Sequence, residues 1–468
     1  MVTSRTSSAT ELLVALQRDD DEPMHSQLER ELRTAVRNRR LPPDSVLPST
    51  RSLAEQLGVS RGVVVEAYEQ LVAEGYLVGR HGSATRVSAR AAGPATECPP
   101  QPTAPRIRFD FRPGRPDVSQ FPRDTWLRSL RRALDEAPAD RFNYSDGRGL
   151  LELREALASY LNRVRGTAAD ADRIVISNGY SQGLSLVCQV LRAAGATRLA
   201  IEDPSYEGAR DTVRAAGLEL VPIGIDDHGL RVDELERTVA DAVLVTPAHQ
   251  YPTGAVLPPA CRADLAAWAV RHDALIIEDD YDAEYRYDRD PIGAIQGIAP
   301  DHVVYAGSAS KTLAPGLRLG WLLVPASVVE RLAAAKIAAD NGSPALEQLA
   351  FADFVQRGEL GRHLRRMRVI YRRRRDALVS ELATHLPELR VTGTAAGLHL
   401  LAWLPPDLDE ATIVRRAGEV GLHVYGMAPH RMRPASPEGL IFGYANLTES
   451  QIGAGVRQLA SVIEMARR

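Results

Sequence analysis

One lysine in this chain has the surroundings expected of a reactive amine. The chain holds 57 lysines and arginines, and only Lys311 and Lys336 among them are lysines. Arginine can replace lysine in most surface roles, but its guanidinium stays protonated and cannot act as an amine nucleophile. A lysine retained in such a chain therefore indicates amine chemistry, for example a Schiff base with a carbonyl compound. Lys336 lies in an alanine-rich helical run, RLAAAKIAAD, and is interpreted there as a lysine left by chance.

The neighbours of Lys311 suit a phosphorylated aldehyde. The segment reads SASKTLAPGLRLG, which places the hydroxyls of Ser308 and Ser310 beside the lysine. Arg318 follows seven residues after Lys311 and offers a planar pair of donors for a phosphate group.

Elements that could position this lysine follow from residue 109 onward. Helices alternate with short apolar strands, which is typical of an α/β domain around a mostly parallel sheet. Helices are expected at 126–134 and 150–164, and strands at 173–176, 242–246 and 274–277.

Side chains able to bind one phosphorylated ring follow the ends of such strands. The loop 177–183 (SNGYSQG) precedes a helix expected from residue 184, and free N–H groups at that helix start favour an anion. The ring of Tyr206 could stack on a planar ligand, although a half-buried core role is the simpler interpretation of a lone tyrosine. Asp279, at the end of a buried strand, needs a cationic partner such as a pyridinium nitrogen. The alternative for Asp279 is a solvated acidic turn.

The first ninety residues carry the pattern of a winged helix-turn-helix. Helices are expected at 24–39, 51–57 and 61–74, with the tight turn 58–60 between the second and third. Strands at 76–78 and 85–87 would form the wing. Arg51 and Arg61 fall at two helix N-termini and Arg80 falls in the wing, where phosphate and base contacts are made. The alternative is a structural winged helix that binds protein.

Composition limits the remaining possibilities. The net charge of −3 argues against a uniformly basic nucleic-acid coat but allows a local basic face. Cys98, Cys188 and Cys261 are scattered and odd in number, so neither a disulfide framework nor a metal site is indicated. No secretory signal and no run of about 18 apolar residues is found, so a cytoplasmic protein with no membrane partner is expected. The proline- and alanine-rich stretch 89–105 is interpreted as a semi-extended linker.

Residues 41–89 resemble the winged helix of GntR-type bacterial repressors over nearly their whole length. The chain departs from that pattern at Gly62, where the family usually has an asparagine after the arginine, and at Ala84 in the wing. The resemblance implies binding to a double-stranded DNA operator through Ser49, Thr50, Arg51, Ser60, Arg61, Gly62, Val63, Tyr68, Arg80, His81 and Gly82.

The segment around Lys311 resembles the lysine motif of fold-type I, pyridoxal-phosphate-dependent aminotransferases. On that resemblance Lys311 forms the internal aldimine, Ser308 and Arg318 hold the phosphate, Asp279 pairs with the ring nitrogen, and Tyr281 contacts the phenolic oxygen. The stretch NYSDGRG implies that a tyrosine reaches the phosphate in the neighbouring subunit of a homodimer. The cofactor-binding residues implied are Lys311, Asp279, Tyr281, Tyr206, Tyr180, Ser181, Gln182, Ser308, Ser310, Arg318 and Tyr144.

The chain departs from the aminotransferase pattern in two places. Aminotransferases usually carry Asn-Pro-Thr-Gly where this chain has Tyr251 before the proline, and either His249 or Gln250 could take the place of the asparagine. They also bind the substrate carboxylate through an arginine just before the last strand, whereas 439–444 (GLIFGY) has none. Arg431 and Arg433 lie upstream and are candidates for an effector carboxylate, or else solvated loop charges.

Taken together, residues 23–460 resemble the MocR subfamily of GntR-type regulators. We expect a winged helix-turn-helix at 23–88, a linker at 89–105, and an α/β aminotransferase-like domain at 106–468. The resemblance implies a regulator, not an enzyme, that senses pyridoxal phosphate, an amine or an amino acid through the Lys311 aldimine. Its target genes would serve vitamin B6, 4-aminobutyrate, taurine or amino-acid metabolism. The alternatives are a working aminotransferase with a DNA-binding appendage, and a scaffold without cofactor, which the intact Lys311 and Asp279 disfavour.

Overall fold

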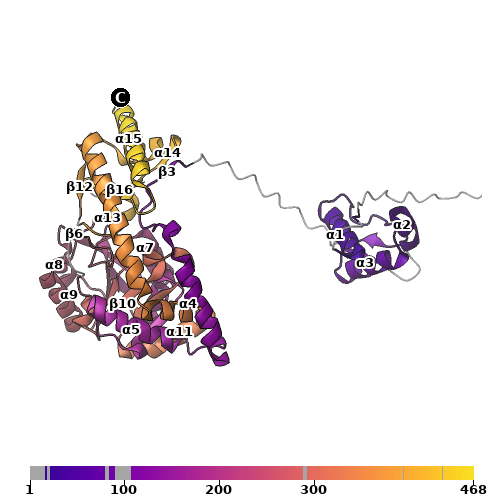
Figure 1. Cartoon of the computed structure of the whole chain (residues 1–468), viewed down its shortest axis with the longest axis horizontal. Coiled ribbons are helices and arrows are strands. Elements are labelled where there is room, and N and C mark those ends of the chain that lie inside the picture. The colour runs from indigo at the N-terminus through magenta and orange to yellow at the C-terminus, as the bar shows by residue number, and fades with distance from the viewer. Residues whose placement is uncertain are drawn as a thin grey trace, which may run out of the picture. The chain divides into compact units, whose positions relative to one another are not determined.

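The chain folds into two compact units, residues 1–104 and 105–468, in a computed structural model (Figure 1). The structure describes residues 16–17, 22–79, 84–89, 107–287, 292–393, 395–434 and 436–467. Most of the predicted linker, the tip of the predicted wing and Cys98 lie outside these residues. In the part of the chain that is described, no helix is both long and apolar enough to cross a membrane.

Unit 1 contains the predicted helix-turn-helix. Its helices are α1 (Met24–Arg37), α2 (Thr50–Leu57) and α3 (Arg61–Ala73), and β1 (Leu77–Val78) pairs antiparallel with β2 (Arg86–Val87). Gly58 ends α2 with φ +64°, a left-handed conformation that favours glycine and turns the chain toward α3. The helices and strands expected in this region are confirmed. Their apolar faces meet in one core that includes Leu28, Leu53 and Val64.

Unit 2 is built around an eight-stranded sheet of order β4-β11-β10-β9-β8-β5-β6-β7. The pairs β10–β9, β9–β8, β8–β5 and β5–β6 are parallel, which confirms the mostly parallel sheet, whereas β11 is antiparallel to both of its neighbours. The strands are β4 (Ile174–Ser177), β5 (Arg198–Asp203), β6 (Glu219–Asp226), β7 (Gly229–Leu230), β8 (Ala242–Val245), β9 (Leu275–Asp279), β10 (Val303–Ser308) and β11 (Gly320–Leu323).

Helices cover both faces of this sheet. Val175 and Ile277 pack with apolar residues of α6, α7 and α11, whereas Val243 and Ile276 point to the other face and pack with α8 and α9. The alternation follows from the two-residue period of a strand. The helices of this lobe are α4 (Arg123–Glu136), α5 (Leu151–Arg165), α6 (Tyr180–Ala193), α7 (Glu207–Ala215), α8 (Val232–Glu236), α9 (Pro259–His272), α10 (Ala309–Thr312), α11 (Ala326–Asp340) and α12 (Ala345–Gln356).

A smaller lobe of unit 2 contains a four-stranded antiparallel sheet of order β12-β13-β16-β15. The long helix α13 and the last helix α15 pack side by side (Figure 1). A short pair, β3 with β14, is parallel. The elements are β3 (Phe109–Asp110), α13 (Glu359–His385), β12 (Arg390–Thr392), β13 (His399–Trp403), α14 (Glu410–Glu419), β14 (Leu422–His423), β15 (Tyr425–Gly426), β16 (Gly439–Gly443) and α15 (Glu449–Ala466).

One predicted boundary is wrong. The helix expected from residue 184 begins at Tyr180, so Tyr180, Ser181 and Gln182 form its first turn and not a loop. Asn178 and Gly179 make the turn between β4 and α6, where Gly179 has a φ of +85°, and the side chain of Gln182 accepts the N–H of Asn178 at 2.7 Å. Gln182 therefore holds the turn that precedes the helix, and the first N–H groups of α6 receive no side-chain cap.

Candidate functional site

Lys311 lies on the short helix α10, directly after the central strand β10. Its Nζ atom donates a hydrogen bond to the carbonyl oxygen of Gly114 at 2.6 Å. Burial lowers the pKa of Lys311, against the charges of Asp279 and Asp282, which raise it. A lowered pKa increases the fraction of uncharged amine, which is the nucleophilic form.

The carboxyl group of Asp279 ends the neighbouring strand. β9 and β10 are parallel, and Asp279 pairs in register with Ala306, so both strands deliver their C-terminal residues to one edge of the sheet. The pKa of Asp279 is raised to about 8, mainly by burial and in smaller part by Asp280, whereas the nearby Tyr180 hydroxyl and Lys311 oppose the rise. A carboxyl group in this position is stabilised as an anion by any cation placed against it.

A candidate anion cradle lies where β4 and β10 end and β11 begins. Ser177 of β4 pairs with Gly320 of β11, and Gly320 pairs with Ser308 of β10, so these residues lie in one row across the sheet. The antiparallel β11 is what brings the sequence-distant Ser177 and Ser308 together. The Oγ atom of Ser308 accepts the N–H of Ser310 at 3.0 Å and caps α10.

Arg318 reaches the start of α6 from this row. Its Nη2 donates to the carbonyl oxygen of Asn178 at 2.7 Å, and a Cβ atom added to Gly179 would lie 2.7 Å from the guanidinium. Gly179 provides no side-chain cap, so the first N–H groups of α6 stay available to a ligand. A guanidinium beside an uncapped helix N-terminus is a suitable binding site for a phosphate group.

Three tyrosines line the same region. The ring centroids of Tyr206 and Tyr251 lie 5.9 Å apart, and those of Tyr251 and Tyr281 lie 6.1 Å apart, with both pairs edge to face. Tyr206 follows β5 and is 47% exposed, so it is not the core residue that a lone tyrosine suggests. Its ring is free to cover a planar ligand.

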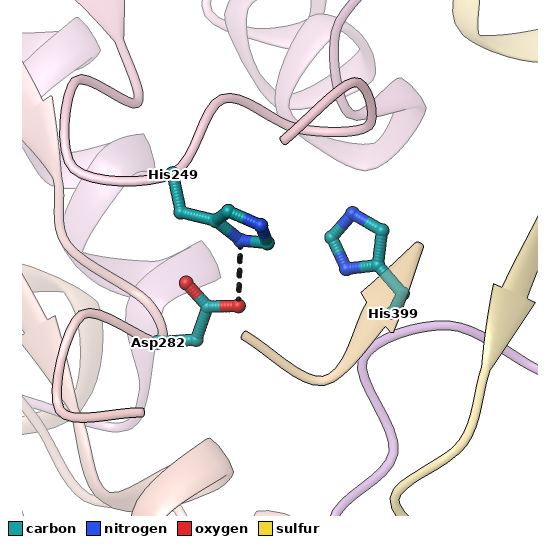
Figure 2. A group of neighbouring side chains, drawn as sticks. All are labelled: His249, Asp282 and His399. Carbon is teal, nitrogen blue, oxygen red and sulfur yellow. Dashed lines mark hydrogen bonds and ion pairs between the residues drawn. The ribbon is translucent and has the colours of Figure 1, made fainter. Parts of the chain in front are cut away.

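A buried cluster of His249, Asp282 and His399 lies next to Tyr281 (Figure 2). Nδ1 of His249 lies 3.0 Å from the Asp282 carboxylate and 3.0 Å from the Tyr281 hydroxyl, which in turn donates to the backbone carbonyl oxygen of His249. One potential ligand atom from each of the three lies within 4.8 Å of the others, a spacing that a metal ion could use. Because Nδ1 of His249 already has two partners, we interpret the cluster as a hydrogen-bond network.

Gln250, the other candidate for the missing asparagine, is used by its own loop. Its amide nitrogen donates to the carbonyl oxygens of Pro204 and Tyr251, and its amide oxygen accepts from the hydroxyl and the N–H of Thr253. These bonds stabilise the turn. They use both the amide nitrogen and the amide oxygen of Gln250, so its side chain is not available to bind a ligand.

The two candidate effector arginines lie on the wall of a cavity of about 770 Å³, which also contacts Thr253 and Trp403. Arg433 forms ion pairs with Asp203 and Glu234 at 3.2 and 3.1 Å. Arg431 donates to the carbonyl oxygen of Pro437 and lies over the ring of Trp403, and burial lowers its pKa. Arg431 is half-buried, and Arg433, although 48% exposed, is ion-paired, so both arginines have partners within the protein.

In unit 1, the predicted DNA contacts divide by exposure. Ser49 caps α2 by accepting the N–H of Ser52, and Arg51 and Arg61 are exposed at the starts of α2 and α3. Ser60 and Gly62 are exposed as well, Thr50 and Val63 are half-buried, and Arg80, His81 and Gly82 lie outside the described residues.

Tyr68 is a correction to the predicted DNA contacts. It is only 4% exposed, and its hydroxyl donates to the carbonyl oxygen of Pro48 at 3.0 Å. The period of α3 places Tyr68 on the apolar face with Val64, Ala67 and Leu71, a pattern the sequence already contained. Tyr68 therefore stabilises the unit 1 core and joins α3 to the segment before α2.

Comparisons with known proteins match both units. Residues 117–459 match the family model for aminotransferase class I and II, and residues 24–87 match that for bacterial regulatory proteins of the gntR family. The chain is 33% identical to the probable rhizopine catabolism regulatory protein MocR of Rhizobium meliloti, covering 96% of this chain and 95% of that protein. It is 32% identical to the HTH-type pyridoxine biosynthesis transcriptional regulator PdxR of Corynebacterium glutamicum, covering 97% and 99%.

A solved structure with the same fold is the α-aminoadipate aminotransferase LysN of Thermus thermophilus, in complex with N-(5'-phosphopyridoxyl)-L-leucine. The two share 26% identity and a TM-score of 0.70, over 77% of this chain and 92% of that one. Unit 2 thus has the fold of an enzyme that binds pyridoxal phosphate.

Proposed function

We propose how this protein acts from the premise that the chain belongs to the bacterial GntR-type regulators of the MocR subfamily, whose larger unit is a class I and II aminotransferase fold. It is a DNA-binding transcriptional regulator, and its cofactor is pyridoxal phosphate. The observation that carries the proposal is that a helix-turn-helix and a lysine–aspartate–arginine site occur in one chain.

The residues of the unit 2 site fit the cofactor. Bound pyridoxal phosphate supplies an aldehyde carbon, a basic ring nitrogen and a phosphate dianion. Lys311 offers the amine. Asp279 offers a buried carboxyl group with a raised pKa, and a protonated ring nitrogen beside it would lower that pKa and stabilise the carboxylate. Arg318 and the uncapped start of α6 at Gly179 form the phosphate cradle.

The remaining predicted residues support these groups. Tyr206 covers the ring, and the buried hydroxyl of Tyr180 lies near Asp279 and favours its ionised form. We assign Ser181, the most exposed residue in the first turn of α6, and Ser308 to the phosphate, whereas Gln182 and Ser310 act through the bonds that shape the two helix starts.

We further propose that His249 stands where aminotransferases have asparagine. The Asp282 carboxylate orients its ring, and Nδ1 holds the hydroxyl of Tyr281, the predicted contact for the phenolic oxygen. Gln250 is excluded because its amide is occupied by the turn.

The site is completed by a second copy of the chain. Tyr144 is 85% exposed, which is unusual for a tyrosine, and Phe142 nearby is 49% exposed. Leu127 and Leu134 are exposed on α4 and extend the apolar surface. We propose a homodimer in which Tyr144 reaches the phosphate bound by the partner.

The effector is an amine or amino acid, or pyridoxal phosphate itself. We assign its carboxylate contact to Arg431, because Arg433 is already neutralised by two carboxylates. One relative is named for pyridoxine biosynthesis and the other for rhizopine catabolism. We therefore propose two classes of target genes, those for vitamin B6 synthesis and those for the use of an amine.

The experiment is a titration of the full-length protein with pyridoxal phosphate and then with a panel of amines and amino acids, followed by absorption and by DNA binding to a selected operator pool. Borohydride treatment followed by peptide mapping should locate the cofactor on Lys311, one of only two lysines. Modification of Lys336, or none, would refute the assignment of Lys311.

An amine that alters both the spectrum and the affinity for DNA identifies the effector. Steady release of a keto acid with no effect on DNA binding would favour the enzyme instead.

A further inference from the structure

We propose that the second lysine, Lys336, is a positioning residue for the phosphate cradle, acting through Asp340 on the turn that begins α6. The inference rests on the proposed function, because it takes the cradle at Gly179 and Arg318 as the place where the cofactor phosphate binds. It assigns a role to a lysine that composition alone suggests was left by chance.

Lys336 is fully buried, at 0% exposure, on α11. Its Nζ atom donates to both carboxylate oxygens of Asp340, at 2.7 and 2.6 Å. Pairs spaced four residues apart on a helix are common at exposed surfaces and contribute little to stability there. Burial of the ammonium group makes this pair different, because an ammonium removed from water requires its partner.

Asp340 connects that lysine to the cradle. Its Oδ2 atom accepts hydrogen bonds from the side-chain amides of Asn178, at 2.8 Å, and Gln182, at 2.6 Å. The carbonyl oxygen of Asn178 accepts from Arg318, and the amide oxygen of Gln182 accepts from the N–H of Asn178. The carboxylate of Asp340 thus bonds one residue before Gly179 and one residue after it, and so stabilises the turn on both sides.

Charge explains why this carboxylate needs a lysine. Burial would raise the pKa of Asp340, but the hydrogen bonds from Lys336 and Gln182 outweigh that effect and lower the pKa, so the group stays ionised. A negative charge just behind a phosphate site would repel the ligand. The ammonium of Lys336 neutralises that charge and lets Asp340 organise the amide donors without opposing the phosphate.

The test compares two ligands that differ only in the phosphate. Full-length wild type and Lys336→Met are titrated with pyridoxal phosphate and with pyridoxal, and binding is followed by absorption. Loss of supporting bonds behind a binding group typically costs about 10- to 100-fold in affinity. We expect that loss for pyridoxal phosphate and less than about a twofold change for pyridoxal.

The outcomes separate the inference from its premise. Equal loss for both ligands, or no loss for either, would overturn the role of Lys336 in the cradle. A wild type that binds both ligands equally well would instead refute the cradle itself. Arg415→Met is the matched control: it removes the cation of an exposed pair with Glu419 on α14, and it should change neither affinity.

Two more variants extend the test: Asp340→Asn stands in if Lys336→Met does not fold, and the double variant tests the charge argument if it does. Asp340→Asn keeps the shape of the side chain but cannot accept from Asn178 and Gln182 in the same way, so it should show the same selective loss. The double variant Lys336→Met, Asp340→Asn removes both charges, so it should bind pyridoxal phosphate better than Lys336→Met alone. No recovery would refute the charge argument.

Discussion

Replacing Asp279 by asparagine should stabilise the cofactor-free protein at high pH while weakening its hold on the cofactor. The carboxyl group of Asp279 is 9% exposed, and burial raises its pKa to about 8, against about 3.9 in an unfolded chain. Between these two values the folded state retains a proton that the unfolded state has lost. The free energy of unfolding therefore falls with rising pH in this window and levels off above about pH 8.

The size of the stability difference follows from the width of this pH window. For each pH unit inside the window, the free energy of unfolding of the wild type falls by about 1.4 kcal/mol. Between pH 5 and pH 8 the wild type should thus lose about 3 to 4 kcal/mol relative to Asp279→Asn, whose amide does not titrate. Glu202 and Glu278, whose pKa values burial raises to about 7, remain in both proteins, so their contribution cancels in the comparison.

The assay is urea unfolding of the cofactor-free wild type and variant at pH 5 and at pH 8, monitored by a probe in unit 2. Asp227→Asn, which changes an exposed carboxylate on the loop after β6, is the matched control and should show no pH-dependent difference. An equal difference between wild type and Asp279→Asn at both pH values would refute the reasoning. Saturation with pyridoxal phosphate should reverse the order of stability, because the ligand stabilises the protein in which Asp279 can pair with the ring.

Three further outcomes are expected. Arg61→Ala should weaken operator binding and reduce the slope of log affinity against log salt by about 1 if Arg61 contacts a phosphate, as measured by fluorescence anisotropy at several salt concentrations. Tyr68→Phe should lower the stability of unit 1 by about 1 kcal/mol, seen in thermal unfolding, because the bond to Pro48 is lost, and DNA affinity at low temperature should stay unchanged. Gly179→Ala should reduce affinity for pyridoxal phosphate by more than about tenfold in an absorption titration, because the new methyl group would meet the guanidinium of Arg318 and the φ of +85° strains any residue but glycine.

The parts of the site that depend on local sequence patterns could be predicted from the sequence. A strand followed by Asp279, and a strand followed by a short segment containing Lys311, are local patterns, and parallel pairing of β9 with β10 brings their ends together. The helices and strands of unit 1 were likewise predictable, because their apolar periods and caps are local.

Other parts of the site depend on contacts that no local pattern contains. The antiparallel insertion of β11 aligns Ser177, Gly320 and Ser308 across the sheet. The hydrogen bond from Asn178 to Asp340 joins the turn before α6 to the last residue of α11, so the sequence alone shows only the Lys336–Asp340 spacing. Tyr68 is different: its helical period was visible, and the DNA-binding prediction failed because a family pattern was preferred to that period.

The bond between Lys311 and Gly114 has a consequence for how unit 2 could report that its site is occupied. Gly114 lies near the start of unit 2, soon after the predicted linker at 89–105, and Phe111 in the same segment is fully buried. Any reaction that joins the Lys311 nitrogen to a carbon atom leaves it fewer hydrogens to donate, and so changes its hydrogen bond to the Gly114 carbonyl. One hydrogen bond thus joins the reactive atom of the site to the segment that begins the described part of unit 2.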